Sequence, residues 1–386
     1  MSQDPQIGEI QIRPVEGRRG HAEFFAVKRL ICSQHSAAVL PMRFMEWAQL
    51  NDQTHPFYKH ARRKMFVAYL NGRPVGRIAA IQDHMHNEYY QDQLGTFGFF
   101  ECIENQDVAN LLLKTAEDQL RSWGCNQIRG PLNPSMKGEF GVLVEGNDWP
   151  PFLMIAWTPR YYDVLLQKAG FVVCKRFYAF LLDTVKKHDE MENNYAHLQQ
   201  VSAKILGRFP NIKVSRATKE NVLDLVREIN VIGNRVRSDG YGFVPNTDEE
   251  LDFMVSQIKR IIDPRIVIVA HVDGRLAAYN VCVPNINWAL KRSKGRWDWL
   301  RLPQFLYWMR RIPEVRLIAV GVDPKSAAKG LSALVTEQMV AMHANFTYWE
   351  FSWIAEDNLP SMSAMFRGAA AEKYKVIQLY EKPIAN

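Results

Sequence analysis

One order of predicted secondary structure occurs twice along this chain of 386 residues. In each half a strand and a helical region precede a β-hairpin, and a strand, a helix, a strand, a helix and a final strand follow. The two hairpins turn at Asn71-Gly72 and at Asp273-Gly274, and such pairs readily adopt positive φ. Because strands alternate with amphipathic helices, we expect an α/β protein with two tandem domains, each a mixed central sheet flanked by helices.

A charged stretch with weak apolar periodicity, Val185 to Asn194, separates the two halves. We therefore predict an N-terminal domain at 1–185, a linker helix at 186–210 and a C-terminal domain at 211–386. Two domains suit the length, because one domain typically holds about 150 residues. The last strand of each half is predicted at Phe171–Leu182 and at Tyr374–Tyr380.

The composition, with 47% hydrophobic and 23% charged residues, is that of a packed globular protein. The net charge of +7 indicates an anionic partner, which charge alone does not distinguish among nucleic acid, a lipid surface and a phosphate-bearing small molecule. The five cysteines are widely spaced without a Cys-x-x-Cys pair, so we expect neither disulfides nor a metal site. Because the sequence contains no secretory signal pattern and no window of about 20 apolar residues, we expect a cytoplasmic protein, free or peripheral on the inner membrane.

The strongest candidate for a ligand-binding site is the segment that joins an apolar strand ending at Val322 to a helix beginning near Gly330. The residues between them are mostly small. Backbone N–H groups at such a helix start, reinforced by the helix dipole, can bind a diphosphate. Lys325 or Lys329 would add positive charge. The alternative is an ordinary strand-to-helix turn without a ligand.

This loop resembles the pyrophosphate loop of the acetyltransferase superfamily, which reads Val-x-Pro and then Arg or Gln-x-x-Gly-x-Gly or Ala. The chain matches at Val322, Pro324 and Gly330, whereas Ala327 replaces the basic or amide residue and Ser332 replaces the last small residue. Further segments are similar to a bacterial family of tandem GNAT-like acyl-CoA N-acyltransferases, so the resemblance covers nearly the whole chain. These segments are Gly130-Pro131-Leu132-Asn133, Gly138-Glu139-Phe140-Gly141, Pro150-Pro151, Tyr161-Tyr162, Tyr241-Gly242-Phe243-Val244-Pro245 with Glu249-Glu250, 350–358 and 374–383.

The resemblance implies that acyl-CoA, as co-substrate, binds between splayed central strands of the C-terminal half. It also implies a degenerate N-terminal half on the acceptor side, since no phosphate loop follows Phe99 to Ile103. The residues implied in cofactor binding are Val322, Ser326, Ala327, Ala328, Lys329, Gly330, Leu331, Ser332 and Asn358.

Acyl transfer from a thioester to an amine needs a base and a proton for the leaving thiolate. Glu350 and Ser352 share one face of a predicted strand, where a buried carboxylate either faces a cleft or pairs with a cation. Glu350 is thus either a candidate base or part of a structural ion pair. By resemblance Tyr380 is the candidate acid, with core packing as the alternative. His84 and His86, at the end of the first hairpin, either contact the acceptor amine or form a solvated strand end.

The segment Trp288–Ile312 combines six aromatic side chains with seven basic ones, opposed by Asp298 alone. This combination is typical of a surface that contacts anionic lipid headgroups, and the alternative is a helix packed on its domain with a solvated basic rim. Nucleic-acid binding through this segment is the least favoured of the three interpretations. A membrane contact would suit a long-chain acyl donor or an amphipathic amine.

The resemblance extends to bacterial ceramide synthases, which acylate the amine of a sphingoid base from acyl-CoA. It therefore implies an N-acyltransferase for a sphingoid base. Two alternatives remain open: an acetyltransferase for a small polar amine or aminoacyl acceptor, and a non-catalytic module that binds acyl-CoA or lipid, because Ala327 departs from the superfamily pattern.

Overall fold

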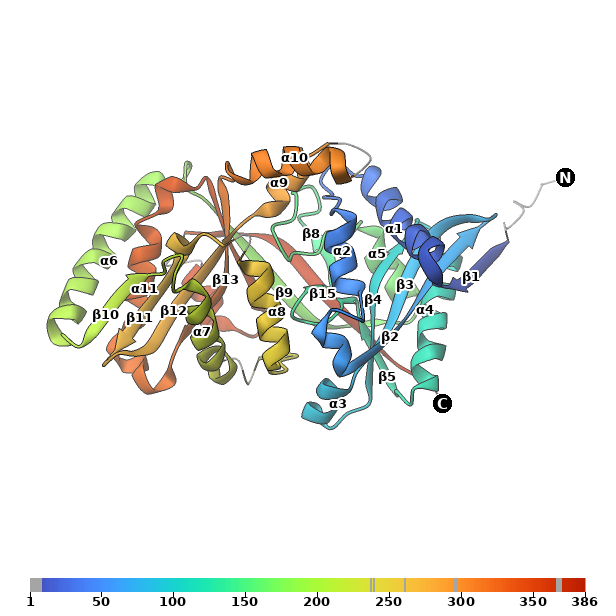
Figure 1. Ribbon diagram of the computed structural model, residues 1–386, viewed down its shortest axis with the longest axis horizontal. Helices are drawn as coiled ribbons and strands as arrows, with labels where there is room; N and C mark the ends of the chain where they lie inside the picture. Colours follow the sequence, from blue (N-terminus) through green and yellow to red (C-terminus); the bar gives the residue numbers. More distant parts are fainter. Residues whose placement is uncertain are drawn as a thin grey trace. The chain divides into compact units, whose positions relative to one another are not determined.

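The computed structural model describes residues 9–236, 238, 240–259, 262–294, 298–365 and 370–385, with the backbone alone for 258, 327 and 328 (Figure 1). Residue contacts divide the chain into two compact units. Unit 1 is Met1–Arg176 with Val376–Asn386, and unit 2 is Phe177–Lys375.

Unit 1 is built on a mixed sheet. Its strands are β1 (Ile10–Pro14), β2 (Ala61–Leu70), β3 (Arg73–Asp83), β4 (Leu94–Cys102), β5 (Gln127–Gly130), β8 (Val142–Glu145) and, from Val376, β15 (Glu372–Pro383). The short strands β6 (Leu132–Asn133) and β7 (Glu139–Phe140) pair with each other in a separate two-stranded sheet. The order across the sheet is β1-β2-β3-β4-β5-β15, and β4 and β5 are parallel whereas the other neighbours are antiparallel.

Helices cover both faces of this sheet. They are α1 (Gly17–Ser33), α2 (Arg43–Leu50), α3 (His84–Tyr90), α4 (Gln106–Ser122) and α5 (Tyr161–Lys168), with a 3-10 turn, η1 (Pro56–Lys59). Successive residues of β3 point to opposite faces, so Ile78 and Ala80 join the core with α4 and α5, and Ala79 and Ile81 join the core with α1.

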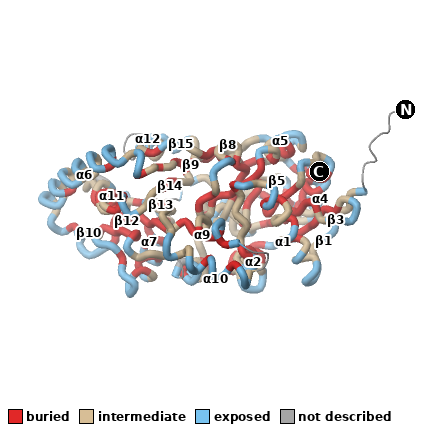
Figure 2. Tube along the Cα trace, turned by 90° about the horizontal axis from the view of Figure 1, so that it is seen from above, coloured by how far each residue is buried: buried red, intermediate tan, exposed pale blue. Residues whose placement is uncertain are grey.

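Unit 2 has the same kind of sheet. From Phe177 it contains β9 (Val172–Asp183), and then β10 (Ile212–Arg216), β11 (Val267–Val272), β12 (Arg275–Pro284), β13 (Glu314–Val322) and β14 (Tyr348–Ala355). The order is β10-β11-β12-β13-β14-β9, and only the β13–β14 pair of this path is parallel. Figure 2 shows β12 buried along most of its length, as expected for a strand covered on both faces.

The helices of unit 2 again pack on both faces of the sheet. They are α6 (His188–Arg208), α7 (Val222–Val236), α8 (Asp248–Ile258), α9 (Ile286–Arg292), α10 (Asp298–Met309), α11 (Leu331–Val340) and α12 (Leu359–Ser363), with 3-10 turns η2 (Pro264–Ile266), η3 (Pro324–Lys329) and η4 (His343–Asn345). Met191 of α6 and Leu334 of α11 belong to one core, and Leu225 of α7 belongs to the other.

Each unit takes its final strand from the other half of the sequence. The end of β15 pairs with β5 in unit 1, with Tyr380 opposite Gly130. The end of β9 pairs with β14 in unit 2, with Phe180 opposite Phe351. The predicted domains at 1–185 and 211–386 are continuous in sequence, whereas the two units are defined by contacts. The two descriptions differ because β15 lies in unit 1 from Val376 and β9 lies in unit 2 from Phe177.

The predicted hairpins are confirmed. Strands β2 and β3 turn at Asn71 and Gly72, with φ of 51° and 75°, and β11 and β12 turn at Asp273 and Gly274, with φ of 52° and 76°. The predicted helix Leu359–Gly368 begins as α12 at Leu359, and its residues 366–368 lie outside the described part.

The predicted strand end at His84 and His86 is wrong, because these residues open helix α3. The Asp83 carboxylate accepts the N–H groups of Met85 and His86 and caps this helix.

Candidate functional site

The two central strands of unit 2 part halfway along their length. The parallel pairing of β13 with β14 covers four positions, from Glu314 opposite Tyr348 to Leu317 opposite Phe351. Strand β13 nevertheless continues to Val322, paired with β12 on its other side. The register of β12 with β13 shifts by one residue at Ile318, and such a bulge turns a strand away from its neighbour. Beyond Leu317 the edge of β13 toward β14 therefore has no partner in the described ladder.

A tight turn follows this open edge. After Val322 the chain forms η3 and reaches Gly330, whose φ of 69° places it in the left-handed region, and α11 begins at Leu331. Gly330 provides no side-chain cap, so the first N–H groups of α11 point out of the helix without a side-chain acceptor. Together with the helix dipole these groups favour an anion at this end of α11.

The turn brings most of the predicted cofactor residues together. Leu331 is buried in the core, whereas Ser332 is exposed. The N–H of Ser326 donates to the carbonyl of Asp323 at 2.8 Å, so this amide is already engaged. The side chains of Ala327 and Ala328 lie outside the described part of the chain.

Charged side chains gather at the same turn. The ammonium of Lys329 lies 5.8 Å from the ring centre of Phe209. Arg235, from α7, lies with its Nη1 3.9 Å from Asp323 Oδ2. Arg235 was not predicted from the sequence, because it lies about 90 residues before the loop. It nevertheless brings a positive charge to the turn, where the superfamily pattern has a basic or amide residue and this chain has Ala327.

The corresponding place in unit 1 is filled by the chain itself. Pairing of β4 with β5 also ends early, after Thr96 opposite Arg129. Strand β6 lies there, and Asn133 Oδ1 accepts the Phe99 N–H at 2.6 Å. A Cβ on Gly98 would lie 1.8 Å from the Leu132 carbonyl oxygen, which shows how closely β6 fits against β4.

The helix that follows β4 also differs from α11, because a side chain caps its first turn. The side chain of Asn105 accepts the Val108 N–H at 3.0 Å and caps α4. Units 1 and 2 therefore share a parting of the central strands but differ in what occupies it and in how the next helix is capped.

A buried ion pair marks the point where β13 and β14 part. Glu350 is fully buried, and its Oε2 lies 3.0 Å from Nε of Arg316, directly across the two strands. Burial raises the pKa of Glu350 to about 7, and the positive charges of Arg316 and Lys375 oppose this rise. Lys375 is itself fully buried. A carboxyl group with a pKa near neutrality is poised to exchange a proton, as a general base does.

Three further residues, Ser352, Trp353 and Tyr374, surround this ion pair. The carbonyl of Ser352 accepts a hydrogen bond from Arg316 at 3.4 Å, and the Arg316 guanidinium lies 4.6 Å from the ring centre of Trp353. Burial and the nearby Glu350 charge raise the pKa of Tyr374 well above its ordinary value. Sequence reasoning named Glu350 and Ser352 but missed Arg316, Lys375 and Tyr374, because their contacts are not local in sequence.

Tyr380 belongs to unit 1, whereas Glu350 belongs to unit 2. The Tyr380 side chain is fully buried in the core with α4 and α5. Its hydroxyl lies 2.5 Å from Asp163 Oδ1 and 2.7 Å from Gln378 Oε1, and burial raises its pKa far above the ordinary range. This arrangement favours the core-packing alternative for Tyr380.

Two of the three remaining candidates, His86 and Asn358, have local partners. His84 is exposed, and His86 Nε2 lies 3.5 Å from Asp92 Oδ2 while burial lowers the pKa of His86. Asn358 is exposed and accepts the Ser361 N–H at 3.2 Å, so it caps α12.

The segment Trp288–Ile312 forms α9 and α10, with Arg296 and Trp297 outside the described residues. Arg301 and Phe305 are buried and anchor α10. Most of its other apolar side chains are exposed, and Trp299, at 71%, is among the most exposed large hydrophobic residues described. The exposed members are Trp299, Leu300, Leu302, Leu306 and Tyr307, and the exposed basic neighbours are Lys291, Arg292, Lys294, Arg310 and Arg311. Among the described helices none combines the length and the hydropathy of a membrane span.

Similar architecture occurs in solved proteins. A tandem GNAT protein from the clavulanic acid biosynthesis pathway superposes with a TM-score of 0.54, covering 98% of this chain and 99% of that chain at 12% identity. The chain has the tandem GNAT fold. The predicted fold class of two tandem GNAT-like domains is thereby confirmed.

Sequence comparison finds relatives of the same length. The chain is 27% identical over 391 aligned residues to a bacterial ceramide synthase of Caulobacter vibrioides, covering 99% of both chains. It is 28% identical over 357 residues to Protein YghO of Escherichia coli, covering 89% of this chain and 88% of that protein. No family model matches the chain. The tandem GNAT fold of this chain thus accompanies full-length similarity to a bacterial ceramide synthase.

Proposed function

We propose that this protein is an acyl-CoA-dependent N-acyltransferase that moves a long-chain acyl group to the amine of a sphingoid base. The observation that carries the proposal is the early end of β13–β14 pairing, at Leu317 and Phe351, beside a turn into a helix without a side-chain cap. An extended thioester arm can hydrogen-bond along such an open strand edge, and an anionic diphosphate can bind at such a helix start. Because β6 fills the counterpart in unit 1, one acyl-CoA binds per chain.

The diphosphate binds at the start of α11, where Gly330 leaves the first N–H groups accessible. Lys325 and Lys329 stand beside it, and Arg235 supplies the charge that Ala327 does not. The pantetheine arm then extends along the open edge of β13 beyond Leu317 and hydrogen-bonds the backbone there.

Glu350 moves the proton in this scheme. The amine attacks the thioester carbonyl carbon, a C–N bond forms and the C–S bond breaks. Glu350, with a pKa of about 7, accepts the proton of the nitrogen and passes it to the departing thiolate, since an ordinary thiol has a pKa of about 8.5 and holds the proton more tightly. Arg316 keeps the carboxylate in place, and unpartnered β13 amides stabilise the oxyanion.

The exposed apolar face of α10 supports a lipid substrate. Trp299, Leu302 and Leu306 follow one another at intervals of three and four residues, so they share one side of the helix. Basic side chains flank this side and pair with anionic headgroups. A protein attached there draws both a long-chain acyl donor and an amphipathic amine from the bilayer. The similarity to a ceramide synthase over 99% of the chain supports the same substrate class.

The test is turnover of purified full-length protein with palmitoyl-CoA and sphinganine in mixed micelles. Free thiol is measured continuously, and mass spectrometry identifies the N-acylated base. We expect stoichiometric thiol and amide, with acetyl-CoA a much poorer donor. Thiol release that requires acetyl-CoA and a small polar amine would replace this proposal with a small-molecule acetyltransferase.

One observation favours a non-catalytic acyl-CoA-binding protein as the second candidate. The carboxylate of Glu350 is already paired with Arg316, and a paired carboxylate can be purely structural. Calorimetric titration separates the two functions: saturable binding of palmitoyl-CoA without turnover on any amine of a long-chain and polar panel supports the second candidate.

A further inference from the structure

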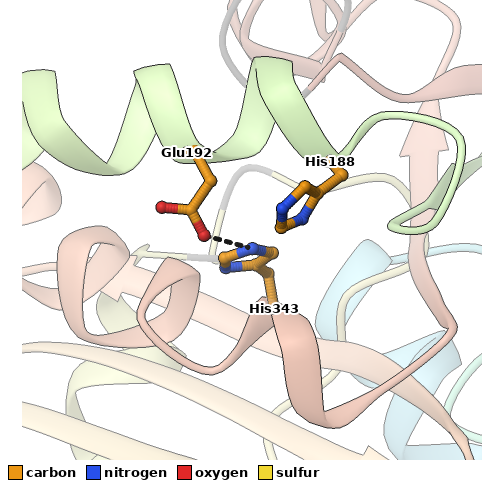
Figure 3. A group of neighbouring side chains, drawn as sticks. All are labelled: His188, Glu192 and His343. Atoms are coloured by element: carbon orange, nitrogen blue, oxygen red, sulfur yellow. Dashed lines mark ion pairs between the residues drawn. The ribbon is translucent and has the colours of Figure 1, made fainter.

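Three metal-ligating side chains of unit 2 converge away from the β13 turn (Figure 3). His188 and Glu192 lie one turn apart on α6, and His343 begins η4, just after α11. One potential ligand atom from each lies within 4.8 Å of the other two. Figure 3 shows the three side chains pointing toward one another from these two segments.

The hydrogen bond of His343 fixes which nitrogen faces the cluster. Its Nδ1 lies 2.9 Å from the Val340 carbonyl, an acceptor, so Nδ1 carries the hydrogen. In the neutral ring Nε2 then presents a lone pair, and it lies 3.3 Å from Glu192 Oε1. Imidazole ligands of metals are commonly held by such a bond from the other ring nitrogen to a carbonyl.

Two acceptors that face each other at this distance require a cation between them. Either His343 is doubly protonated or a metal ion bridges Nε2 and the Glu192 carboxylate. Two ligands of a tetrahedral zinc ion, each about 2.0 Å from the metal, are about 3.3 Å apart. His188 adds a third donor, because its ring centre is 5.9 Å from that of His343. The His343 side chain is buried, whereas His188 and Glu192 are exposed, so the cluster is open to solvent on one side only.

We propose that His188, Glu192 and His343 bind a divalent transition-metal ion of the zinc class, with the fourth position open to water. Two imidazoles and one carboxylate suit zinc, cobalt, nickel or copper rather than magnesium or calcium. The ion links the first turns of α6 to the segment after α11, and so stabilises the helix pair that packs on one face of the unit 2 sheet. Neither the sequence nor its cysteine spacing predicts this site, because His343 is about 150 residues from the α6 ligands.

Cobalt is the first probe, because its visible spectrum reports coordination directly. Full-length protein is freed of metal with a chelator and titrated with Co²⁺. We expect a saturable d–d absorption band at one equivalent, and its displacement by Zn²⁺ but not by Mg²⁺. Calorimetry with Zn²⁺ should give the same stoichiometry, and Zn²⁺ should raise the melting temperature.

His188→Ala is the decisive variant, because His188 is exposed and its loss leaves the fold intact. We expect at least tenfold weaker Zn²⁺ binding and loss of the cobalt band. His197→Ala, at another exposed histidine of α6, is the matched control and should bind as the unmodified protein does. A featureless Co²⁺ titration, or equal Zn²⁺ affinity in His188→Ala and the control, would leave a simple histidine–carboxylate ion pair and overturn the proposal. Acyl transfer is assayed separately, so either result leaves the proposed function to its own test.

Discussion

Arg316 and Glu350 face each other across β13 and β14, with 3.0 Å between Nε and Oε2, one residue before those strands part. A fully buried carboxylate at this point is costly to ionise, and its cation lowers that cost without removing it. The result is a carboxyl group that titrates near neutrality beside the open edge of β13. This pair therefore links the parting of the strands to the proposed chemistry.

Glu350→Gln should lower kcat/KM for acyl transfer by about 10²–10⁴-fold, because the amide cannot carry the proton. Its effect on stability near neutral pH should be small, since glutamine resembles the neutral carboxyl group that the raised pKa of Glu350 favours in the folded protein. Thiol release and denaturant unfolding measure the two effects. Adding Arg316→Met to Glu350→Leu should recover part of the stability and none of the activity. Normal turnover by the double variant would assign the pair a structural role alone.

Activity should rise with pH through a limb centred near 7, because Glu350 must be ionised to accept the proton and its pKa is about 7. Rate profiles between about pH 5 and 9 at saturating acyl-CoA measure this limb. In Glu350→Gln the residual rate should lack it. If the variant keeps the same limb, another group carries the titration.

Stability should show the opposite pH dependence. The folded pKa of Glu350 lies above its ordinary value of 4.5, so the folded protein holds this proton more tightly than the unfolded chain. The resulting stabilisation is complete below about pH 4.5 and is lost as the pH rises to about 7, a change of about 3 kcal/mol. Urea unfolding of the wild type and Glu350→Gln at several pH values isolates this contribution. A difference between the two proteins that does not vary with pH contradicts it.

Gly330→Ala should weaken acyl-CoA binding at least tenfold. At φ of 69° a side chain costs about 1–2 kcal/mol, and its Cβ would lie 2.9 Å from Ile205 Cδ1, so the turn or the end of the Ile205 side chain must shift. Calorimetry with palmitoyl-CoA measures the affinity. Gly207→Ala is the matched control, because Gly207 lies in α6 with open space around it and alanine there should stabilise by about 0.5–1 kcal/mol.

Asn133→Ala should destabilise the protein by about 1–3 kcal/mol and leave acyl-CoA affinity unchanged. It removes the acceptor of the Phe99 N–H, which then lies in the sheet without its partner. Binding should remain at one acyl-CoA per chain in both proteins. A second equivalent in the variant would mean that β6 blocks a functional site in unit 1.

Trp299→Ala with Leu306→Ala should reduce binding to vesicles rich in anionic lipid, because both side chains belong to the exposed apolar side of α10. Vesicle sedimentation at low and high salt measures the apolar and charge contributions. Leu111→Ala, at an exposed leucine of α4, should bind as the wild type does. Equal loss in all variants would argue against a specific lipid-facing surface.

Local chemistry explains what the sequence predicted. Asn71-Gly72 and Asp273-Gly274 encode their hairpins through φ preference alone, and the left-handed Gly330 opens α11 where the loop pattern expects a helix. The strand prediction at His84 failed because the polar alternation continued past Asp83, whereas the Asp83 side chain caps a helix there.

Non-local contacts explain what the sequence could not predict. No period or motif connects Glu350 to Lys375, or Tyr380 to Asp163. Asn133 stood in a recognised motif, but only the fold shows that its side chain fills the gap beside β4. Contacts between residues that are distant in sequence produce no local pattern from which they could be predicted.

The exchange of β9 and β15 makes the two halves of the gene interdependent. A polypeptide that ended after the first half would lack β15, which pairs with β5 at Gly130. The unpaired N–H and C=O groups of β5 would then favour pairing with another copy of the chain. The second half alone would lack the Phe180 strand in the same way. Each half of the sequence therefore depends on the other to complete its sheet, although only unit 2 keeps an open edge where its central strands part.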